Sequence, residues 1–379
     1  MNPSDFSDST APPFDRVGAD AVSLDHQSLI TLAGCNYLGL AHDPAVLRAA
    51  HDALDQYGLS TSASRRTSGN TREHTALEAE LADFLGFEGA VLTPDGYTAN
   101  LVAAQRLAMD CCVALLDERA HASLVDAARC AGLEVRTYPH LDHAAAGALA
   151  GEHRDRGVAV MTDSVFATDG AIAPLRELAA ALPESNAYLL VDDCHGFCVL
   201  GAQGEGTLGH LGLRDPRIRQ TTTLAKGLGC FGGVACGPAT WADHARRTCN
   251  AAVCTTPAPP AAASAARAAL RLVRAEPIRI ERLRMNIDRL RTTIRAAGFP
   301  AHDAMIPIFA IWLPSPAQTR ALSSALREEG FFVPASEYPG GPSATYLRIS
   351  VTARHRAEDL DRFGAALARL TPKCPARSA

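Results

Sequence analysis

Strand-like and helix-like segments alternate through the middle of this 379-residue chain, and this alternation constrains the fold more than any other feature. Short apolar or β-branched runs predict strands, and each is followed by a stretch with the apolar period of a helix. The predicted strands cover 89–93, 113–117, 134–138, 157–162, 187–192 and 219–224, and the predicted helices cover 97–108, 121–131, 142–150 and 174–182. Such alternation predicts an α/β fold in which helices cover both faces of a mostly parallel sheet.

The segments on either side of this alternation predict three parts. A polar N-terminal arm is expected over 1–35, a large domain over 36–270 and a small C-terminal α/β domain over 271–379. The alanine- and arginine-rich stretch 258–297 predicts one long connecting helix between the two domains. Within the small domain, strands are predicted at 307–313 and 346–351, and helices at 315–329 and 356–370.

Composition and charge exclude several classes of partner. The net charge is -5, which gives no reason to expect binding to nucleic acid or to an anionic membrane. No apolar run reaches the roughly 18 residues that span a bilayer, and the first residues lack the pattern of a signal peptide, so we expect a cytoplasmic protein. The 11 cysteines include no CxxC pair, so we expect reduced thiols and no metal site.

The main candidate site lies where two neighbouring predicted strands end. The β-branched run 219–224 leads to Lys226, and the apolar run 187–191 leads to Asp192 and His195. An amine, an acid and an imidazole at adjacent strand ends are the groups that pyridoxal phosphate requires. Taken singly, the lysine could be a solvated strand end, and the Asp-Asp-x-His segment could be a helix cap or half of a metal site. Their order and spacing favour the cofactor site.

Three further loops carry candidate residues. Gly96 opens a helix after a strand, which predicts a phosphate site at free backbone N–H groups. His121 stands at the start of another predicted helix, where it is as often a surface residue as a catalytic one. Arg65 lies in the hydroxyl-rich run 60–69, which is either a flexible surface loop or an anion-binding loop of an active site.

Several ordered motifs resemble the α-oxoamine synthase family of fold-type I pyridoxal-phosphate enzymes. The similarity extends from about residue 35 to residue 370. The matching segments are Asn36-Tyr37-Leu38-Gly39-Leu40, Gly69 with His74 and Leu77-Glu78, Gly96-Tyr97-x-Ala99-Asn100, His121-Ala122-Ser123-Leu124, Val165-Phe166-x-x-Asp169-Gly170, Val191-Asp192-Asp193-x-His195-Gly196, Thr223-x-x-Lys226 and Leu347-Arg348-Ile349-Ser350.

The resemblance implies a role for each matching residue around the cofactor ring. Lys226 would form the Schiff base and move protons, and Asp192 would pair with the pyridine nitrogen. His195 would bind the phenolic oxygen, and His121 would stack on the ring.

The resemblance also implies phosphate and substrate contacts. The cofactor phosphate would be held by Gly96, Tyr97 and Thr223, and by Thr255 and Thr256 of the other subunit of a homodimer. The substrates would contact Arg348, which would bind the amino-acid carboxylate, and Cys35, Asn36 and Arg65.

The implied reaction condenses a small L-amino acid with an acyl thioester on CoA or a carrier protein, with loss of CO₂, to an α-aminoketone. Another activity on the same fold, as in an aminotransferase, aldolase or decarboxylase, is the main alternative, and a non-enzymatic scaffold is a third. The chain departs from the family at Cys35, where an asparagine is usual, and at Ala167, where a serine is usual. These departures lie on the substrate side and favour a specialised member, as in secondary metabolism.

Overall fold

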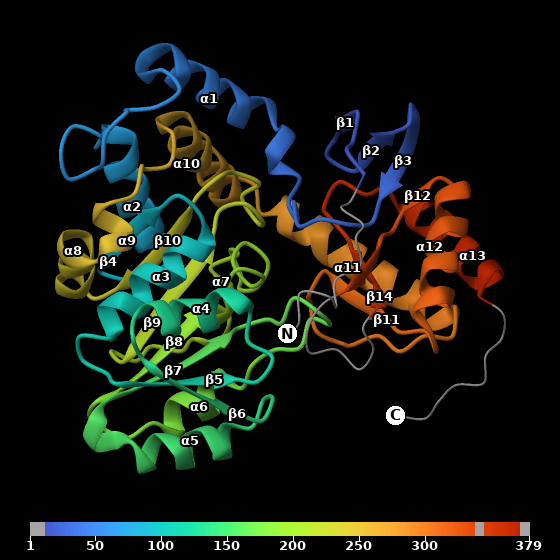
Figure 1. Cartoon of the computed structure of the whole chain (residues 1–379). Helices are drawn as coiled ribbons and strands as arrows, with labels where there is room; N and C mark the ends of the chain where they lie inside the picture. Colours follow the sequence, from blue (N-terminus) through green and yellow to red (C-terminus); the bar gives the residue numbers. More distant parts are fainter. Residues whose placement is uncertain (1–11, 338–344, 372–379) are drawn as a thin grey trace. The chain divides into compact units, whose positions relative to one another are not determined.

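The computed structural model describes residues 12–337 and 345–371, which divide into two compact units (Figure 1). The large unit comprises residues 36–167 and 171–280. Of the described residues, the small unit contains 12–35, 168–170, 281–337 and 345–371.

A seven-stranded sheet organises the large unit, in the order β4-β10-β9-β8-β7-β5-β6. Its strands are β4 (Gly89–Thr93), β5 (Val113–Asp117), β6 (Glu134–Tyr138), β7 (Val158–Asp163), β8 (Ala187–Asp192), β9 (Ile218–Thr223) and β10 (Gly233–Gly237). The ladders β6-β5-β7-β8-β9 are parallel, and β10 is antiparallel to both of its neighbours. The prediction of a mostly parallel sheet is therefore confirmed.

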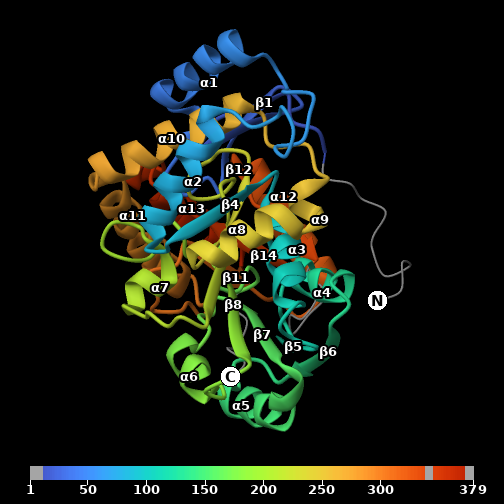
Figure 2. The same ribbon diagram turned by 90° about the vertical axis from the view of Figure 1, so that its left-hand side faces the viewer.

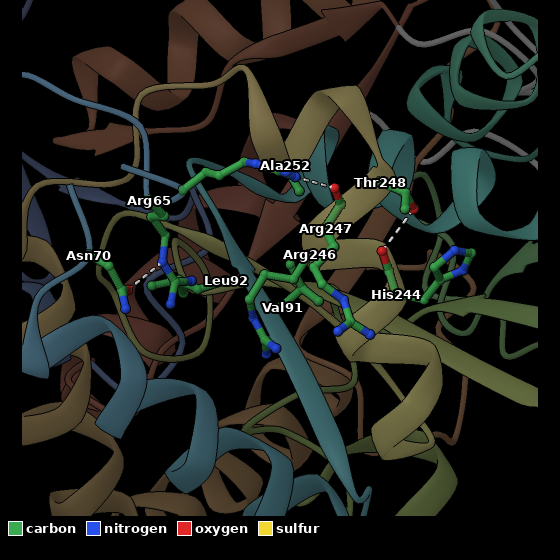
Figure 3. Close-up of a pocket in the computed structure, with 10 residues that line it drawn as sticks. Arg65, Asn70, Val91, Leu92, His244, Arg246, Arg247, Thr248 and Ala252 are labelled. Carbon is green, nitrogen blue, oxygen red and sulfur yellow. Dashed lines mark hydrogen bonds between the residues drawn. The ribbon is translucent and has the colours of Figure 1, made fainter. Parts of the chain in front are cut away.

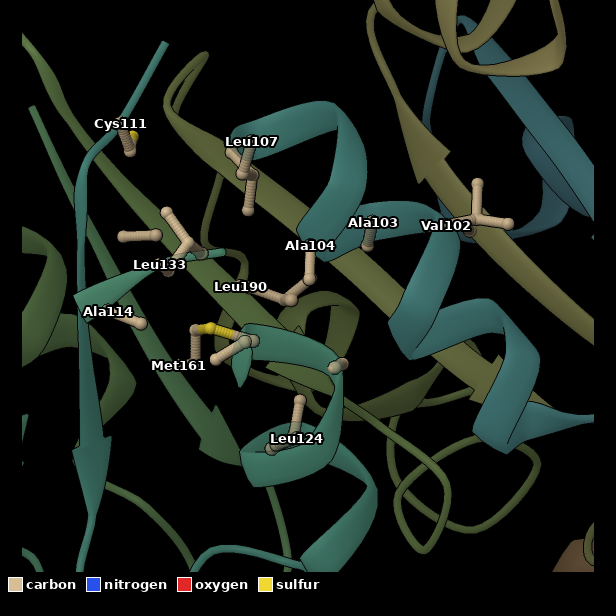
Figure 4. Packing of buried hydrophobic residues seen from close by; sticks show 14 of the residues in the cluster. Val102, Ala103, Ala104, Leu107, Cys111, Ala114, Leu124, Leu133, Met161 and Leu190 are labelled. Carbon is tan, nitrogen blue, oxygen red and sulfur yellow. The ribbon is translucent and has the colours of Figure 1, made fainter. Parts of the chain in front are cut away.

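Helices cover both faces of this sheet because its strands are apolar on both sides. Ala114 and Leu116 of β5 pack with α3 (Gly96–Leu107), α4 (Ala122–Cys130) and α8 (Ala239–Thr248). Val113 and Leu115 of the same strand pack with α5 (His143–Glu152), α6 (Leu175–Ala181) and α7 (Gly206–Leu211). Figure 2 shows α3 and α4 together beside strands β7 and β8, and Figure 4 shows the packing of α3 and α4 side chains.

Further helices complete the large unit. They are α1 (Pro44–Tyr57), α2 (Arg72–Leu85), α9 (Asn250–Val253) and α10 (Pro260–Ala275), with short 3-10 turns at Leu40–His42 and Arg154–Arg156. The single helix predicted over 258–297 is wrong, since α10 ends at Ala275 and α11 (Ile278–Ala296) begins after Pro277. Proline has no N–H to donate and its ring clashes inside a helix, so it separates the two.

The small unit contains two small sheets and the helices that cover them. One sheet has β1 (Arg16–Val17), β2 (Ala21–Leu24), β3 (Gln27–Thr31) and β12 (Phe331–Phe332), and the other has β11 (Ile308–Ile311), β13 (Ala335–Glu337) and β14 (Thr345–Ser350). The helices are α12 (Pro316–Glu328), α13 (Ala357–Leu370) and most of α11. Residues 16–31, within the expected N-terminal arm, form strands β1, β2 and β3, and β3 pairs in parallel with β12. Within the described residues, no helix is long and apolar enough to cross a membrane.

Candidate active site

The carboxyl ends of β8 and β9 bring together Lys226, Asp192 and His195. Asp192 is the last residue of β8 and lies opposite Thr221 of β9, so the segment that follows β9 starts beside it. Lys226 Nζ lies 2.8 Å from His195 Nε2. This is the edge at which open α/β sheets bind ligands.

A buried tyrosine holds the imidazole that contacts the lysine. The Tyr37 hydroxyl lies 2.8 Å from His195 Nδ1, and Tyr37 is fully buried. The imidazole is therefore fixed at both nitrogens, and its Nε2 side faces the amine. Tyr37 was not among the predicted site residues, although it belongs to the segment 36–40 that carried the resemblance.

Asp192 is a buried carboxylate with both oxygens bonded. Its Oδ2 accepts a hydrogen bond from Asn100 Nδ2 at 2.8 Å, and its Oδ1 accepts one from the Cys194 N–H at 3.1 Å. The neighbouring strand β7 ends in Asp163, which lies directly opposite Asp192 in the parallel ladder. Burial, and then the charge of Asp192, raise the pKa of Asp163 to about 8, so Asp163 favours its protonated form at neutral pH.

His121 caps the first turn of α4 and faces the same site. Its backbone N–H donates to Asp163 Oδ2 at 2.8 Å, and its Nδ1 lies 2.7 Å from Ser123 Oγ. Burial lowers its pKa, the charge of Asp192 opposes this effect, and the charge of Lys226 adds to it. Both of these charges act on one ring, which supports a single site for the three residues.

The turn before α3 provides backbone donors. Asp95 caps the helix by accepting from the Thr98 N–H at 2.7 Å. The N–H groups of the first turn of a helix have no partner within the helix and favour an anion. A Cβ at Gly96 would lie 2.9 Å from Cβ of Thr223, so glycine permits the close approach of this turn to β9. The Tyr97 side chain is exposed and donates to Asp126 at 2.6 Å, which raises the Tyr97 pKa to about 12.

These residues fit pyridoxal phosphate. A fixed carboxylate, Asp192, can hold a proton on a ring nitrogen, and the half-buried His121 can lie against a ring face. The Lys226 amine is directed by His195, and the helix N-terminus at Gly96 beside Thr223 can hold a phosphate.

The structure places the remaining predicted residues in other surroundings. Arg348 lies on β14 of the small unit, where its Nη2 is 3.7 Å from Cys35 Sγ. Asn36 accepts a hydrogen bond from the Ala41 N–H at 3.3 Å in the large unit. After α9, the Thr255 hydroxyl donates to the Ala251 carbonyl, and Thr256 is exposed.

Arg65 borders a basic cavity of about 540 Å³, which Figure 3 shows between the 65–70 loop and α8. Its Nη1 and Nη2 donate to the two carboxylate oxygens of Glu78 at 2.5 and 2.9 Å, and its Nε donates to Asn70 Oδ1 at 2.9 Å. Arg246 and Arg247 of α8 also line the cavity. The Arg65 guanidinium thus has intrachain partners for each of its nitrogens.

Comparison with known proteins agrees with this geometry. Residues 27–367 match the family model described as aminotransferase class I and II. The chain is 40% identical to 8-amino-7-oxononanoate synthase of Methylococcus capsulatus, over 93% of this chain and 92% of that protein. It is 39% identical to 8-amino-7-oxononanoate synthase of Halorhodospira halophila, over 94% and 90%.

Solved structures give the same result. The serine palmitoyltransferase of Sphingomonas wittichii superposes with a TM-score of 0.90 at 28% identity, over 95% of this chain and 92% of that one. The matches cover nearly the whole chain, including the strand ends that carry Asp192 and Lys226. The chain therefore belongs to the class I and II aminotransferase family, as a pyridoxal-phosphate-dependent enzyme of the α-oxoamine synthase type.

Proposed function

We propose that this enzyme joins a small L-amino acid to an acyl thioester, releases CO₂ and forms an α-aminoketone. The observation that carries this proposal is the 2.8 Å contact between Lys226 Nζ and His195 Nε2. It lies beside the carboxylate of Asp192, which accepts two hydrogen bonds. An amine held at this point can take a proton from the α-carbon of an amino acid and return it later.

The chain's own residues divide this work. Bound pyridoxal phosphate supplies a protonated ring that draws electrons from the α-carbon. Asp192 holds the ring proton, and the Gly96 turn with Thr223 anchors the phosphate. Tyr37 and His195 direct Nζ of Lys226.

For the substrates, we propose L-alanine and a seven-carbon acyl thioester with a terminal carboxylate. The relatives' name, 8-amino-7-oxononanoate synthase, states a nine-carbon product with an amine at carbon 8 and a ketone at carbon 7. Disconnecting the bond between carbons 7 and 8 leaves a seven-carbon acyl group and a two-carbon amine. That amine is what remains of alanine after the loss of CO₂.

A different substrate pair is the second candidate, and one contact favours it. Arg348, the proposed carboxylate-binding residue, has the Cys35 thiol as a neighbour at 3.7 Å, at the position where an asparagine is usual. A thiol is a weak hydrogen-bond partner and leaves more room than an amide. A specialised member with altered amino-acid or acyl selection therefore stays a prediction.

A matrix of amino acids against acyl thioesters tests the function. We expect free CoA or free carrier protein to appear only when both substrates are present, together with CO₂ and a product of the mass of the α-aminoketone. Lys226→Ala serves as the control and should abolish release. Turnover of an amino acid with a keto acid alone would instead support an aminotransferase, and CO₂ release without thioester would support a decarboxylase.

We also propose a cytoplasmic homodimer in which Thr255 and Thr256 contact the partner's cofactor phosphate. Mixing two inactive variants tests shared sites, since a heterodimer of Lys226→Ala with Thr256→Asp restores one complete site. Random pairing should restore about one quarter of the wild-type activity per dimer. No recovery in mixed dimers that have been verified by mass would refute the shared site.

A further inference from the structure

A row of buried polar side chains runs behind the proposed cofactor site. Thr221, Asn100 and Ser123 are each at most 2% exposed and come from β9, α3 and α4. Asn100 contacts the other two, at 2.6 Å to Thr221 Oγ1 and at 2.9 Å to Ser123 Oγ. It also contacts Asp192 Oδ2 at 2.8 Å. Buried polar groups of this kind have high energetic cost unless all are satisfied.

The carboxylate of Asp192 determines which group donates and which accepts in each hydrogen bond of the row. An ionised carboxylate only accepts, so the Asn100 amide must present its NH₂ group to it. The second proton of that NH₂ group goes to Ser123 Oγ. The Asn100 carbonyl oxygen is left to accept the proton of the Thr221 hydroxyl.

The direction continues to His121. Ser123 Oγ accepts a hydrogen bond from Asn100, and its own hydroxyl can donate to His121 Nδ1, 2.7 Å away. The backbone N–H of Ser123 also donates to this nitrogen at 3.2 Å. A nitrogen that accepts from two donors carries no proton, so the neutral ring has its proton on Nε2.

We infer that Asn100 is a positioning residue that orients the carboxylate of Asp192 and, through Ser123, holds His121 as the neutral Nε2–H tautomer. A neutral imidazole can lie on a cationic ring without charge repulsion. The Asn100 amide would thus control both the orientation of the Asp192 carboxylate and the protonation of the His121 imidazole. The consequence for catalysis rests on the proposed function, whereas the tautomer does not.

Other charged groups act on the same imidazole. Asp192 and Asp126 favour its protonated form, while Lys226 and burial disfavour it. Asp163 bonds to the His121 backbone N–H, not to the ring. Two hydrogen bonds reach Nδ1 of this ring, from the Ser123 hydroxyl and the Ser123 N–H, and both favour a proton on Nε2 of the neutral imidazole.

Nitrogen-15 NMR of the holoenzyme labelled at histidine tests this directly, with His121→Gln to assign the signals. In the wild-type enzyme we expect His121 Nδ1 in the unprotonated range and Nε2 in the protonated range. In Ser123→Ala, loss of one hydrogen bond to the neutral ring should raise the titration midpoint of His121 by about one pH unit. In Asn100→Asp, the Ser123 hydroxyl should donate its hydrogen bond to the new carboxyl group and accept one from the ring, so Nδ1 of His121 should become protonated.

Asn250→Asp makes the same chemical change at an exposed position and should leave the His121 signals unchanged. A wild-type proton on Nδ1 would overturn the inference, as would unchanged His121 signals in Ser123→Ala. The Ser123→Ala result tests the inference even if Asn100→Asp fails to fold, because Ser123→Ala removes only one hydroxyl and should leave the fold intact. An enzyme with the expected tautomer but no condensation activity would refute the proposed function and leave this inference intact.

Discussion

Replacing Arg65 by alanine separates two possible roles for this residue. The structure shows it in a stabilising ion pair with Glu78, whereas the family resemblance implies that it contacts the substrate. Arg65 and Glu78 form a two-pronged ion pair at 2.5 and 2.9 Å, and their side chains are only 11% and 8% exposed. Glu78 also accepts from the Leu92 N–H at 2.7 Å, which connects α2 to β4. The Arg65→Ala change would leave this buried carboxylate without its main cation.

The magnitude follows from these contacts. Removing one partner of a buried ion pair costs about 3–5 kcal/mol, because the other charge stays buried. Arg246 remains 3.5 Å from Glu78 and compensates in part. We therefore expect a loss of about 3 kcal/mol in the free energy of unfolding for Arg65→Ala. The double change Arg65→Met with Glu78→Gln should recover most of this loss, since no charge is then buried alone and the new amide oxygen can still accept from the Leu92 N–H.

Urea unfolding at one protein concentration, with saturating cofactor, measures the effect. Arg66→Ala is the matched control, because Arg66 is exposed and its side chain donates to the Arg247 carbonyl at 2.7 Å, not to a buried carboxylate. Its cost should stay within about 0.5 kcal/mol. The reasoning is refuted if Arg65→Ala keeps wild-type stability and instead raises the KM for the thioester, since Arg65 would then act on substrate.

Three other changes test the site and its electrostatics. Asp192→Asn removes the charge that holds the ring proton and should lower kcat by roughly 100-fold or more, measured as CoA release; a smaller change would remove Asp192 from this role. Tyr37→Phe loses the hydrogen bond to His195 and should lower kcat by roughly 3- to 10-fold, with an unchanged rate counting against the Tyr37–His195–Lys226 chain. Burial raises the pKa of Asp163 from 3.8 to about 8, so its stabilising contribution is present below pH 3.8 and is lost as the pH rises through 8. Asp163→Asn should therefore gain stability relative to wild type as the pH rises across this window, and parallel stability–pH curves from urea unfolding would contradict the raised pKa.

Local sequence signals predicted the strand ends of the large sheet closely. The strand predicted over 187–192 is β8, and the one predicted over 219–224 is β9, shifted by one residue. Buried parallel strands are apolar on both faces, so their continuous apolar sequences can be recognised without any tertiary information. The helix α8 was missed, because it is short and polar on its exposed face and its burial depends on the sheet beneath it.

The candidate site was legible only in part. Lys226, Asp192, His195 and His121 stood out because each follows a recognisable strand or opens a helix. Asn100 belongs to the matched segment 96–100 but was not predicted as a site residue, since an asparagine inside a helix gives no local signal of the Asp192 carboxylate that it contacts.

By itself, the order of strands and helices determined the α/β fold and the edge of the sheet at which the amine and the acid meet. Parallel strands bring their carboxyl ends to one edge, whatever lies between them. Only the tertiary structure decided which partners those groups have: Asn100 with Asp192, Tyr37 with His195, and Glu78 with Arg65. Their sequence separations of 92, 158 and 13 residues carry no common period, because these contacts arise from packing between elements and not from the regular repeat within one.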